Sequence, residues 1–373
     1  MKKVAMLCSG TELYGVGSVL KIYAQKLPDL IFICLSKGSM YDWLIQSGCK
    51  VILLNGGRGF KVNSTLAALV QVPLLIIKNW LLSKKLYKIA QENCIDILHC
   101  HWLPHQILAG FIRSKNLKVI WHIHNNTSYT RLFGLSRKIN LLLARWGADI
   151  IMPVSEYIGN NWKASGKLIR VVRNGVYPYY DAPNQPNNDP IKCVIAGRLC
   201  EDKGHHLAVA AVINANKKGY KVCLDIFGGP IENNPYYDKL RLQVIDNNLE
   251  DSIRFLGFRN DLRENHQKYD LGLQCRIEPE PCGVWICETL VDGLPLIASR
   301  TGGTPELVED GVTGLLFEGN SIADLTEKLI NLISVKEKLI TMRQAAYLRG
   351  RDKFTVDRFI SETQAVYCAL QQQ

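Results

Sequence analysis

The sequence predicts an α/β protein of two doubly wound domains, each a parallel sheet covered by helices on both faces. Three observations predict it. Short apolar runs alternate with longer amphipathic segments, a proline- and asparagine-rich stretch divides the chain, and 373 residues suffice for two domains of ordinary size. Apolar residues make up 47% of the chain and charged residues 21%, a balance that excludes a disordered protein.

Six strands are expected in the first half, in the order KVAMLCS (3–9), LIFICLS (30–36), KVILL (50–54), DILHC (96–100), KVIWHI (118–123) and DIIMPV (149–154). These runs lack polar–apolar alternation, which indicates strands buried on both faces. The first run is too short for the apolar core of a signal peptide, so we expect it to be a buried strand.

Six more strands are expected in the second half: KCVIAG (192–197), CLDIFG (223–228), IRFLG (253–257), LGLQC (271–275), PLIAS (295–299) and GLLFE (314–318). The stretch YPYYDAPNQPNNDP (177–190) has the composition of a linker. The expected domains are residues 1–176, joined by a C-terminal helix over 355–373, and residues 191–354. They should face each other across a ligand-binding cleft.

Charge is divided unevenly between the halves. Residues 1–175 hold 23 lysines and arginines against 7 acids, and residues 176–373 hold 22 against 27. A basic half attracts phosphates, acidic lipid or nucleic acid, but no nucleic-acid-reading motif is present, so nucleic acid is not expected. The twelve cysteines form no C-x-x-C pair, which indicates reduced thiols in a cytoplasmic protein.

The segment TLAALVQVPLLIIKNWLLSKKLYKIA (65–90) leaves two interpretations open. Polar residues interrupt it before it reaches a membrane-spanning length. It is either an ordinary helix packed on the first sheet or an interfacial helix on an anionic membrane, where Lys84, Lys85 and Lys88 would meet the lipid.

Two cations follow the first strand of the second domain, in CVIAGRLCEDKGHHLAV (193–209). Arg198 and Lys203 stand between that strand and a helix that begins after Gly204. Cations and a helix N-terminus at the carboxyl end of a strand favour a pyrophosphate site. The alternative is a pair of solvated surface cations.

Two carboxylates lie eight positions apart around a Pro-Cys-Gly turn. Glu280 precedes the turn, and Glu288 falls in the second turn of a helix expected to begin near Val284. Such acids suit hydrogen bonds to sugar hydroxyls and to a ribose diol, and glycines 302 and 303 allow close backbone approach. Alternatively, both acids are simply solvated.

The segment EPCGVWICETLVDGLPLIASRTGGTPELVEDGVTGLLF (280–317) resembles the E-x7-E region of retaining, family 4-type glycosyltransferases of the GT-B fold. GRLCEDKG is similar to the family's G-R-L-x-x-x-K-G, and MPVSE (152–156), VVRNGV (171–176) and RFLGFRNDL (254–262) match further motifs in order. The match covers nearly the whole chain.

The resemblance implies a role for each matching residue. Glu288 would hold the donor ribose, Arg198 and Lys203 the diphosphate, and Glu280 the hydroxyls of the transferred sugar. The backbone of Gly283, Val284 and Trp285 would lie close to that sugar, and the loop holding Phe258 would contact the base. Two departures are Cys282, where the family has Phe, and a second acid, Glu278, which is the fallback for Glu280.

The first domain is marked less sharply. The loop SGTELYGVGSVL contains Gly17 but lacks the last glycine of a dinucleotide fingerprint, so nicotinamide binding is not expected. The resemblance instead implies a loop facing donor phosphate and acceptor.

Five histidines occur at 99, 101, 105, 122 and 124. They end two separate strands with no cysteine or acid at ligand spacing, so no metal site is expected. The resemblance implies that His124 faces the donor sugar, with His122 second. A satisfied buried histidine is the other interpretation.

The expected activity, implied by the resemblance, is retaining hexosyl transfer from a UDP- or GDP-type sugar to an acceptor hydroxyl. No D-x-D motif occurs, so neither a metal nor a cofactor is expected. The expected acceptor is a lipid-linked oligosaccharide of bacterial O-antigen, capsule or lipopolysaccharide synthesis, met in the cytoplasm or peripherally on the inner face of the membrane. The alternatives are a soluble acceptor, or an epimerase- or phosphorylase-like enzyme that performs no transfer.

Overall fold

The computed structural model of this chain describes residues 2–12, 15–56, 65–126, 135–185 and 189–370. It divides into two compact units, Met1–Arg173 with Ile360–Gln373, and Asn174–Phe359. All twelve expected strands are present, and every pair of neighbouring strands is parallel. The prediction of two doubly wound α/β domains is therefore confirmed.

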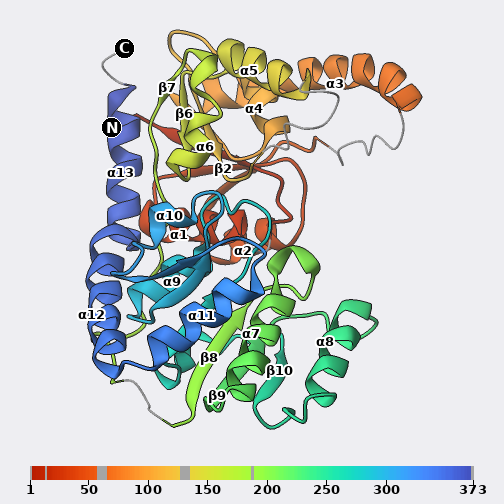
Figure 1. The fold of residues 1–373 in the computed structure, drawn as a ribbon. Coiled ribbons are helices and arrows are strands. Elements are labelled where there is room, and N and C mark those ends of the chain that lie inside the picture. Colours follow the sequence, from red (N-terminus) through yellow and green to blue (C-terminus); the bar gives the residue numbers. More distant parts are fainter. Residues whose placement is uncertain (1, 13–14, 57–64, 127–134, 186–188, 371–373) are drawn as a thin grey trace. The chain divides into compact units, whose positions relative to one another are not determined.

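The sheet of the first unit has the order β3-β2-β1-β4-β5-β6-β7 (Figure 1). Its strands are β1 (Val4–Cys8), β2 (Ile31–Cys34), β3 (Lys50–Leu53), β4 (Ile97–Cys100), β5 (Lys118–Ile123), β6 (Ile150–Pro153) and β7 (Leu168–Ile169). Strands β1, β2, β4 and β6 are buried along their whole length, which explains why their sequences show no alternation.

Helices connect these strands and cover the sheet. They are α1 (Val16–Lys26), α2 (Ser39–Gln46), α3 (Thr65–Glu92), α4 (Leu103–Gly110), α5 (Leu135–Gly147) and α6 (Glu156–Asn160). Helix α4 packs between α3 and α5, and Figure 1 shows these three together. The last helix, α13 (Val356–Ala369), reaches the first unit at Ile360, where Thr363 bonds to Tyr23 of α1 with 3.1 Å between their hydroxyl oxygens.

The sheet of the second unit repeats the same order, as β10-β9-β8-β11-β12-β13. Its strands are β8 (Ile191–Ala196), β9 (Val222–Phe227), β10 (Ile253–Gly257), β11 (Leu271–Gln274), β12 (Leu296–Ser299) and β13 (Gly314–Phe317). Its helices are α7 (His205–Lys217), α8 (Pro235–Ile245), α9 (Val284–Val291), α10 (Thr304–Leu307), α11 (Ile322–Ile333) and α12 (Lys336–Lys353). Leucine, isoleucine and valine from this sheet, α7 and α11 form its main core.

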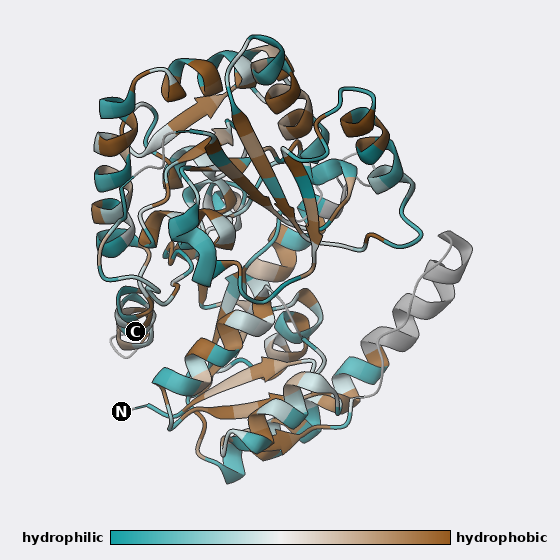
Figure 2. Ribbon diagram, turned by 90° about the horizontal axis from the view of Figure 1, so that it is seen from below, coloured by the Kyte–Doolittle hydropathy of each residue, from teal (hydrophilic) through white to brown (hydrophobic). Residues whose placement is uncertain are grey.

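The hydropathy of the strands fits their burial, since the strands in Figure 2 are mainly hydrophobic. Residues 177–185 and 189–190 of the expected linker contain neither helix nor strand. Among the described residues, no helix is long and apolar enough to cross a membrane.

Candidate functional site

The topology of the second unit indicates where a ligand should bind. Strand β8 lies between β9 and β11, so the chain leaves β8 in one direction and returns to its other side at β11. In open parallel sheets, ligands bind outside the carboxyl ends of the strands at such a switch point. The loops after β8 and β11 carry the cations and acids that the sequence singled out.

The loop after β8 presents the two expected cations. Arg198 is exposed and Lys203 is half-buried, at the end of a short 3₁₀ turn (Glu201–Lys203). Burial lowers the pKa of Lys203, the positive charge of Arg276 lowers it further, and Glu280 opposes the shift. Lys203, Arg276 and Glu280 therefore act on one another electrostatically.

Helix α7 begins directly after this turn because Gly204 permits it. Gly204 has a φ of 69°, and an added Cβ would overlap the carbonyl oxygen of Cys275 after β11. Only glycine lets the two loops approach this closely. Burial and the neighbouring Lys203 lower the pKa of His205, the first residue of α7, to about 4, so it is neutral at pH 7.

Glu280 is buried, with 7% of its surface exposed, and it has a defined partner. The Arg276 guanidinium donates a hydrogen bond from Nη1 to Oε2 of Glu280 over 2.8 Å, and both side chains are largely covered. Glu278 is exposed. Of the two acids that the sequence left open, Glu280 is therefore the one held in a fixed environment.

The backbone around Glu280 is held by the glycine pair that follows β12. The Gly303 N–H donates to the carbonyl oxygen of Glu280 over 2.7 Å. Gly302 has a φ of 56°, and an added Cβ would overlap the Glu280 backbone. The close approach expected of glycines 302 and 303 is therefore an approach to the acid itself.

Helix α9 begins at Val284, as the sequence predicts, and places Glu288 in its second turn. The N-cap residue of α9 is Gly283, which has no side chain. The N–H groups of the first turn are therefore not occupied by a side-chain cap. The indole nitrogen of Trp285 is buried without a partner. The positive end of α9 therefore directly follows the Glu280 turn in the chain.

Glu288 is half-buried, and burial raises the pKa of its carboxyl group. The charge of Arg263 opposes this shift and that of Asp292 adds to it. The carboxyl group is thus harder to ionise than an exposed glutamate, and a ligand that donates hydrogen bonds to it would favour the ionised form.

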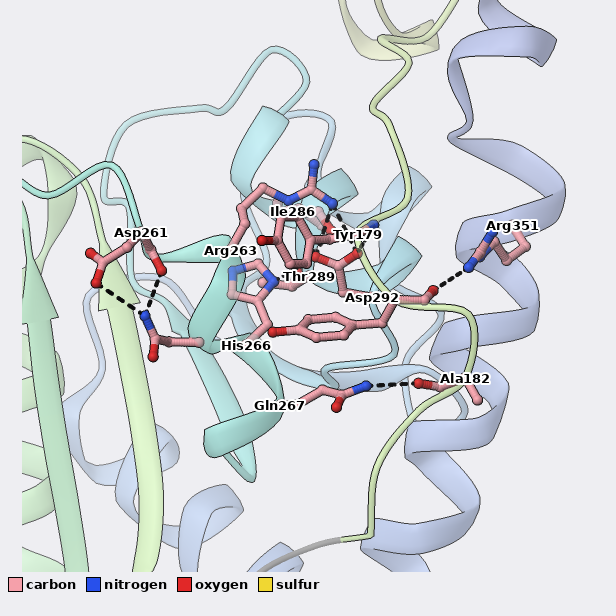
Figure 3. A network of polar contacts seen from close by, with 12 residues as sticks. Tyr179, Ala182, Asp261, Arg263, His266, Gln267, Ile286, Thr289, Asp292 and Arg351 are labelled. Carbon is pink, nitrogen blue, oxygen red and sulfur yellow. Dashed lines mark hydrogen bonds and ion pairs between the residues drawn. The ribbon is translucent and has the colours of Figure 1, made fainter.

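Asp292 anchors the other end of α9 in a network that the sequence did not reveal (Figure 3). Arg263 donates to both its oxygens and His266 donates from Nδ1 over 2.8 Å, while the Tyr179 N–H donates over 3.0 Å. Burial alone would raise the pKa of Asp292, but these partners lower it. The network fixes the helix that carries Glu288.

Phe258 follows β10, and 64% of its surface is exposed. In the strand order it belongs to the edge of the sheet, two strands from β8. Phe258 thus follows the edge strand, whereas Lys203, Arg276 and Glu280 follow the two adjacent central strands, and its role toward a base stays a prediction.

In the first unit, Gly17 lies in the first turn of α1 and packs against the backbone of Glu12. Glu12 is buried and was not singled out from the sequence. Its carboxylate accepts hydrogen bonds from the N–H groups of Ser9 and Gly10, over 2.6 and 2.9 Å, and thereby closes the loop after β1.

Four of the five histidines of the first unit, His99, His101, His122 and His124, form one stack because β4 and β5 are neighbours, while His105 is buried on α4. His99 Nε2 lies 3.1 Å from His122 Nδ1, His101 Nδ1 lies 2.9 Å from His124 Nε2, and His99 also bonds to the Tyr367 hydroxyl over 2.8 Å. Burial lowers the pKa of His124 to about 3, so the ring predicted to face a sugar is neutral at pH 7.

Three of these histidines come from two strands that are separate in the sequence but lie side by side in the sheet. Ligand atoms of His99, His101 and His122 lie within 4.8 Å of one another, close enough to be considered as metal ligands. His99 bonds to His122 and to Tyr367, and the three rings lie with centroids 4.6–5.2 Å apart, while Nε2 of His101 and Nε2 of His122 are buried without a partner. The described geometry is that of a packed layer of neutral imidazoles.

Two family models match consecutive parts of the chain: Glycosyltransferase Family 4 over residues 39–178 and Glycosyl transferases group 1 over residues 179–349. Both models describe glycosyltransferases, and together they cover residues 39–349 of the chain. The structure of Anabaena Alr3699/HepE in complex with UDP matches all of both chains with a TM-score of 0.80 at 22% identity, which shows the GT-B fold.

Two curated glycosyltransferase relatives match most of the chain. The N-acetyl-alpha-D-glucosaminyl L-malate synthase of Bacillus anthracis is 24% identical over 302 residues, 77% of this chain and 78% of the relative. The putative colanic acid biosynthesis glycosyltransferase WcaL of Salmonella typhimurium is 25% identical over 303 residues, 75% of this chain and 71% of the relative.

Proposed function

We propose that this glycosyltransferase-family chain transfers a hexosyl group from a nucleotide diphosphate sugar to an acceptor hydroxyl with retention of configuration. The observation that carries the proposal is the grouping, after β8 and β11, of Lys203, Arg276 and the buried Glu280 beside the start of α9. Cations with a helix N-terminus suit a diphosphate, and a fixed buried carboxylate suits sugar hydroxyls.

In the proposed reaction, the bond between the anomeric carbon and the diphosphate oxygen breaks, and a bond from the acceptor oxygen forms on the same face. The proton of the acceptor hydroxyl passes to the departing phosphate. Arg198, Lys203 and the N–H groups at the start of α9 stabilise the negative charge as it develops. Glu280 orients the transferred sugar, and Glu288 accepts hydrogen bonds from the ribose diol.

In the first unit, we propose that Gly17 faces the donor phosphates and that neutral His124 contacts the donor sugar. A neutral imidazole can donate or accept one hydrogen bond without adding charge to an oxocarbenium-like transition state. The low pKa of His124 supports this role.

We propose that the reaction needs no metal, because the sequence has no D-x-D and the cations above can hold the diphosphate. EDTA should then leave the rate unchanged. A rate lost in EDTA and restored by manganese would contradict this part of the proposal.

We propose that the acceptor is a lipid-linked oligosaccharide of a bacterial surface polysaccharide, met at the cytoplasmic face of the membrane. The excess of cations in residues 1–175 supports an acceptor that carries phosphate and lies on an anionic bilayer. The relative named for colanic acid biosynthesis supports the polysaccharide class.

Thermal stabilisation by nucleotides without added metal tests the donor site. We would compare UDP, GDP, ADP, dTDP, CMP and NAD, starting with UDP because a structural neighbour was solved with it. A ligand at about 100 times its Kd adds about 2.7 kcal/mol, which should raise the Tm by several degrees.

Two exposed arginines of the second unit supply a test variant and its matched control. Arg198→Ala should abolish the shift, and Arg241→Ala on α8 should keep it. A shift with NAD alone would overturn the proposal. Product analysis with and without acceptor then separates transfer from an epimerase- or phosphorylase-like reaction.

A further inference from the structure

Large apolar side chains lie exposed on two helices of the first unit that both pack against α4. On α3 they are Ile77, Trp80, Leu81 and Tyr87, and on α5 they are Ile139, Leu142 and Trp146, with 43–65% of each residue's surface exposed. A single exposed leucine needs no explanation, but seven such residues on two helices of one unit require one.

The two helices cover the same face of the sheet. Both pack against α4, which lies between them, and Figure 1 shows the three helices together. Trp146 packs on Phe111 at the end of α4, with ring centroids 5.2 Å apart, so this part of α5 is held by the body of the unit.

The charge of these helices is strongly positive. Residues 77–92 hold four lysines and a single acid, Glu92, and residues 135–147 hold Arg137, Lys138 and Arg145 with no acid. The Lys84 ammonium lies 3.6 Å from the centre of the Trp80 ring. A lysine stem and an indole side by side is the pairing found where a protein meets the headgroup layer of a bilayer.

We propose that the described parts of α3 and α5 form one docking surface for an anionic membrane. Apolar side chains would enter the headgroup boundary while the surrounding lysines and arginines bind lipid phosphates. An anionic bilayer fits better than a protein partner, because cations accompany the apolar residues on both helices and only one acid does. The inference rests on the proposed function, since it names the surface that meets a lipid-linked acceptor.

Sedimentation with vesicles tests the proposal on the full chain. We would compare phosphatidylcholine alone with phosphatidylcholine mixed with phosphatidylglycerol. Binding should require the anionic lipid and weaken as salt is raised. Equal binding to both vesicle types, or none to either, would overturn the proposal.

Matched variants locate the surface. The pair Leu81→Ser and Leu142→Ser should weaken binding about tenfold or more, while Leu242→Ser and Leu348→Ser, equally exposed in the second unit, should leave it unchanged. Lys84→Glu with Lys85→Glu should weaken binding about tenfold, and Lys217→Glu with Lys218→Glu on α7 and after it should have little effect.

Two further readouts separate the possible outcomes. If the leucine pair instead abolishes self-association in light scattering and leaves vesicle binding intact, the surface binds a second copy and the proposal is wrong. Stabilisation by UDP should be the same in every variant, because none touches the second-unit site. If the protein binds vesicles but no nucleotide raises its Tm, the membrane-docking proposal is supported and the proposed function is contradicted.

Discussion

The two units share one strand order but place different chemistry at equivalent positions. After its first and fourth strands the first unit has the Glu12-closed loop and a layer of neutral histidines. At the same two places the second unit has Lys203 and the Arg276–Glu280 pair. The shared strand order therefore determines where a site can form. The residues that follow these strands determine the chemistry of that site.

The largest effect on activity should come from Glu280, one of the charged residues that only the second unit carries at this position. Replacing Glu280 with Gln should lower kcat about 100-fold or more, because in the proposed reaction this carboxylate, held by Arg276, contacts the reacting sugar. UDP affinity, measured by calorimetry, should stay within about threefold of the native value. The exposed neighbour supplies the control, since Glu278→Gln should retain nearly full activity. Equal losses in both variants would contradict the assignment.

A smaller effect should come from Glu288, and it should depend on pH. Glu288→Ala should raise the donor KM about 10- to 100-fold, because hydrogen bonds to a charged acceptor are lost. Burial raises the pKa of Glu288, so donor affinity should already fall as the pH drops toward that raised value, above the range of an ordinary carboxyl group. In Glu288→Gln this pH dependence should vanish. If the donor affinity of the native protein does not change between pH 8 and about 5, the role of Glu288 is contradicted.

Arg276 should matter by holding Glu280. Arg276→Ala leaves a buried carboxylate without its cation and should lower kcat about tenfold with little change in donor KM. Arg276→Lys should recover part of the loss, and Arg300→Ala, which breaks the exposed pairs with Asp310 and Glu318, should have no effect. If donor KM rises as much as kcat falls, Arg276 binds the donor directly.

The histidine layer should make the first unit sensitive to acid. Folding lowers the pKa of His99 and His124 to about 3, so below about pH 6.5 the unfolded chain binds more protons than the folded one. Stability is fully present above that pH and falls as the pH drops toward 3, by at most about 1.4 kcal/mol per pH unit for each histidine. Six of the seven tryptophans lie in residues 1–173, so urea unfolding followed by tryptophan fluorescence reports on this unit. A midpoint unchanged between pH 7 and 5 would contradict this expectation.

Local patterns predicted much of the fold and part of the site. Continuous apolar runs marked all twelve expected strands, and the turn before Val284 marked the start of α9. Asp292 was missed because its partners Arg263 and His266 lie 29 and 26 positions away and meet it only in the fold.

Two other contacts, Arg276–Glu280 and His99–His122, were missed, each for its own reason. Arg276 precedes Glu280 by four positions, but its loop is not helical, so helical spacing gave no reason to pair them. The contacts between His99 and His122 could have been found, because two histidine-bearing strands that follow each other in the chain often pair as neighbours.

The close approach of Gly302 to the Glu280 backbone limits which substitutions the proposed donor site can accept. A side chain at 302 would overlap the Glu280 backbone, so substitutions there should displace the Glu280 carboxylate. The exposed positions before the turn, such as Glu278, carry no such constraint. In the proposed site, where Glu280 holds the transferred sugar, libraries that aim to change that sugar should vary exposed residues before the turn, such as Glu278. They should leave Gly302 and Gly303 intact.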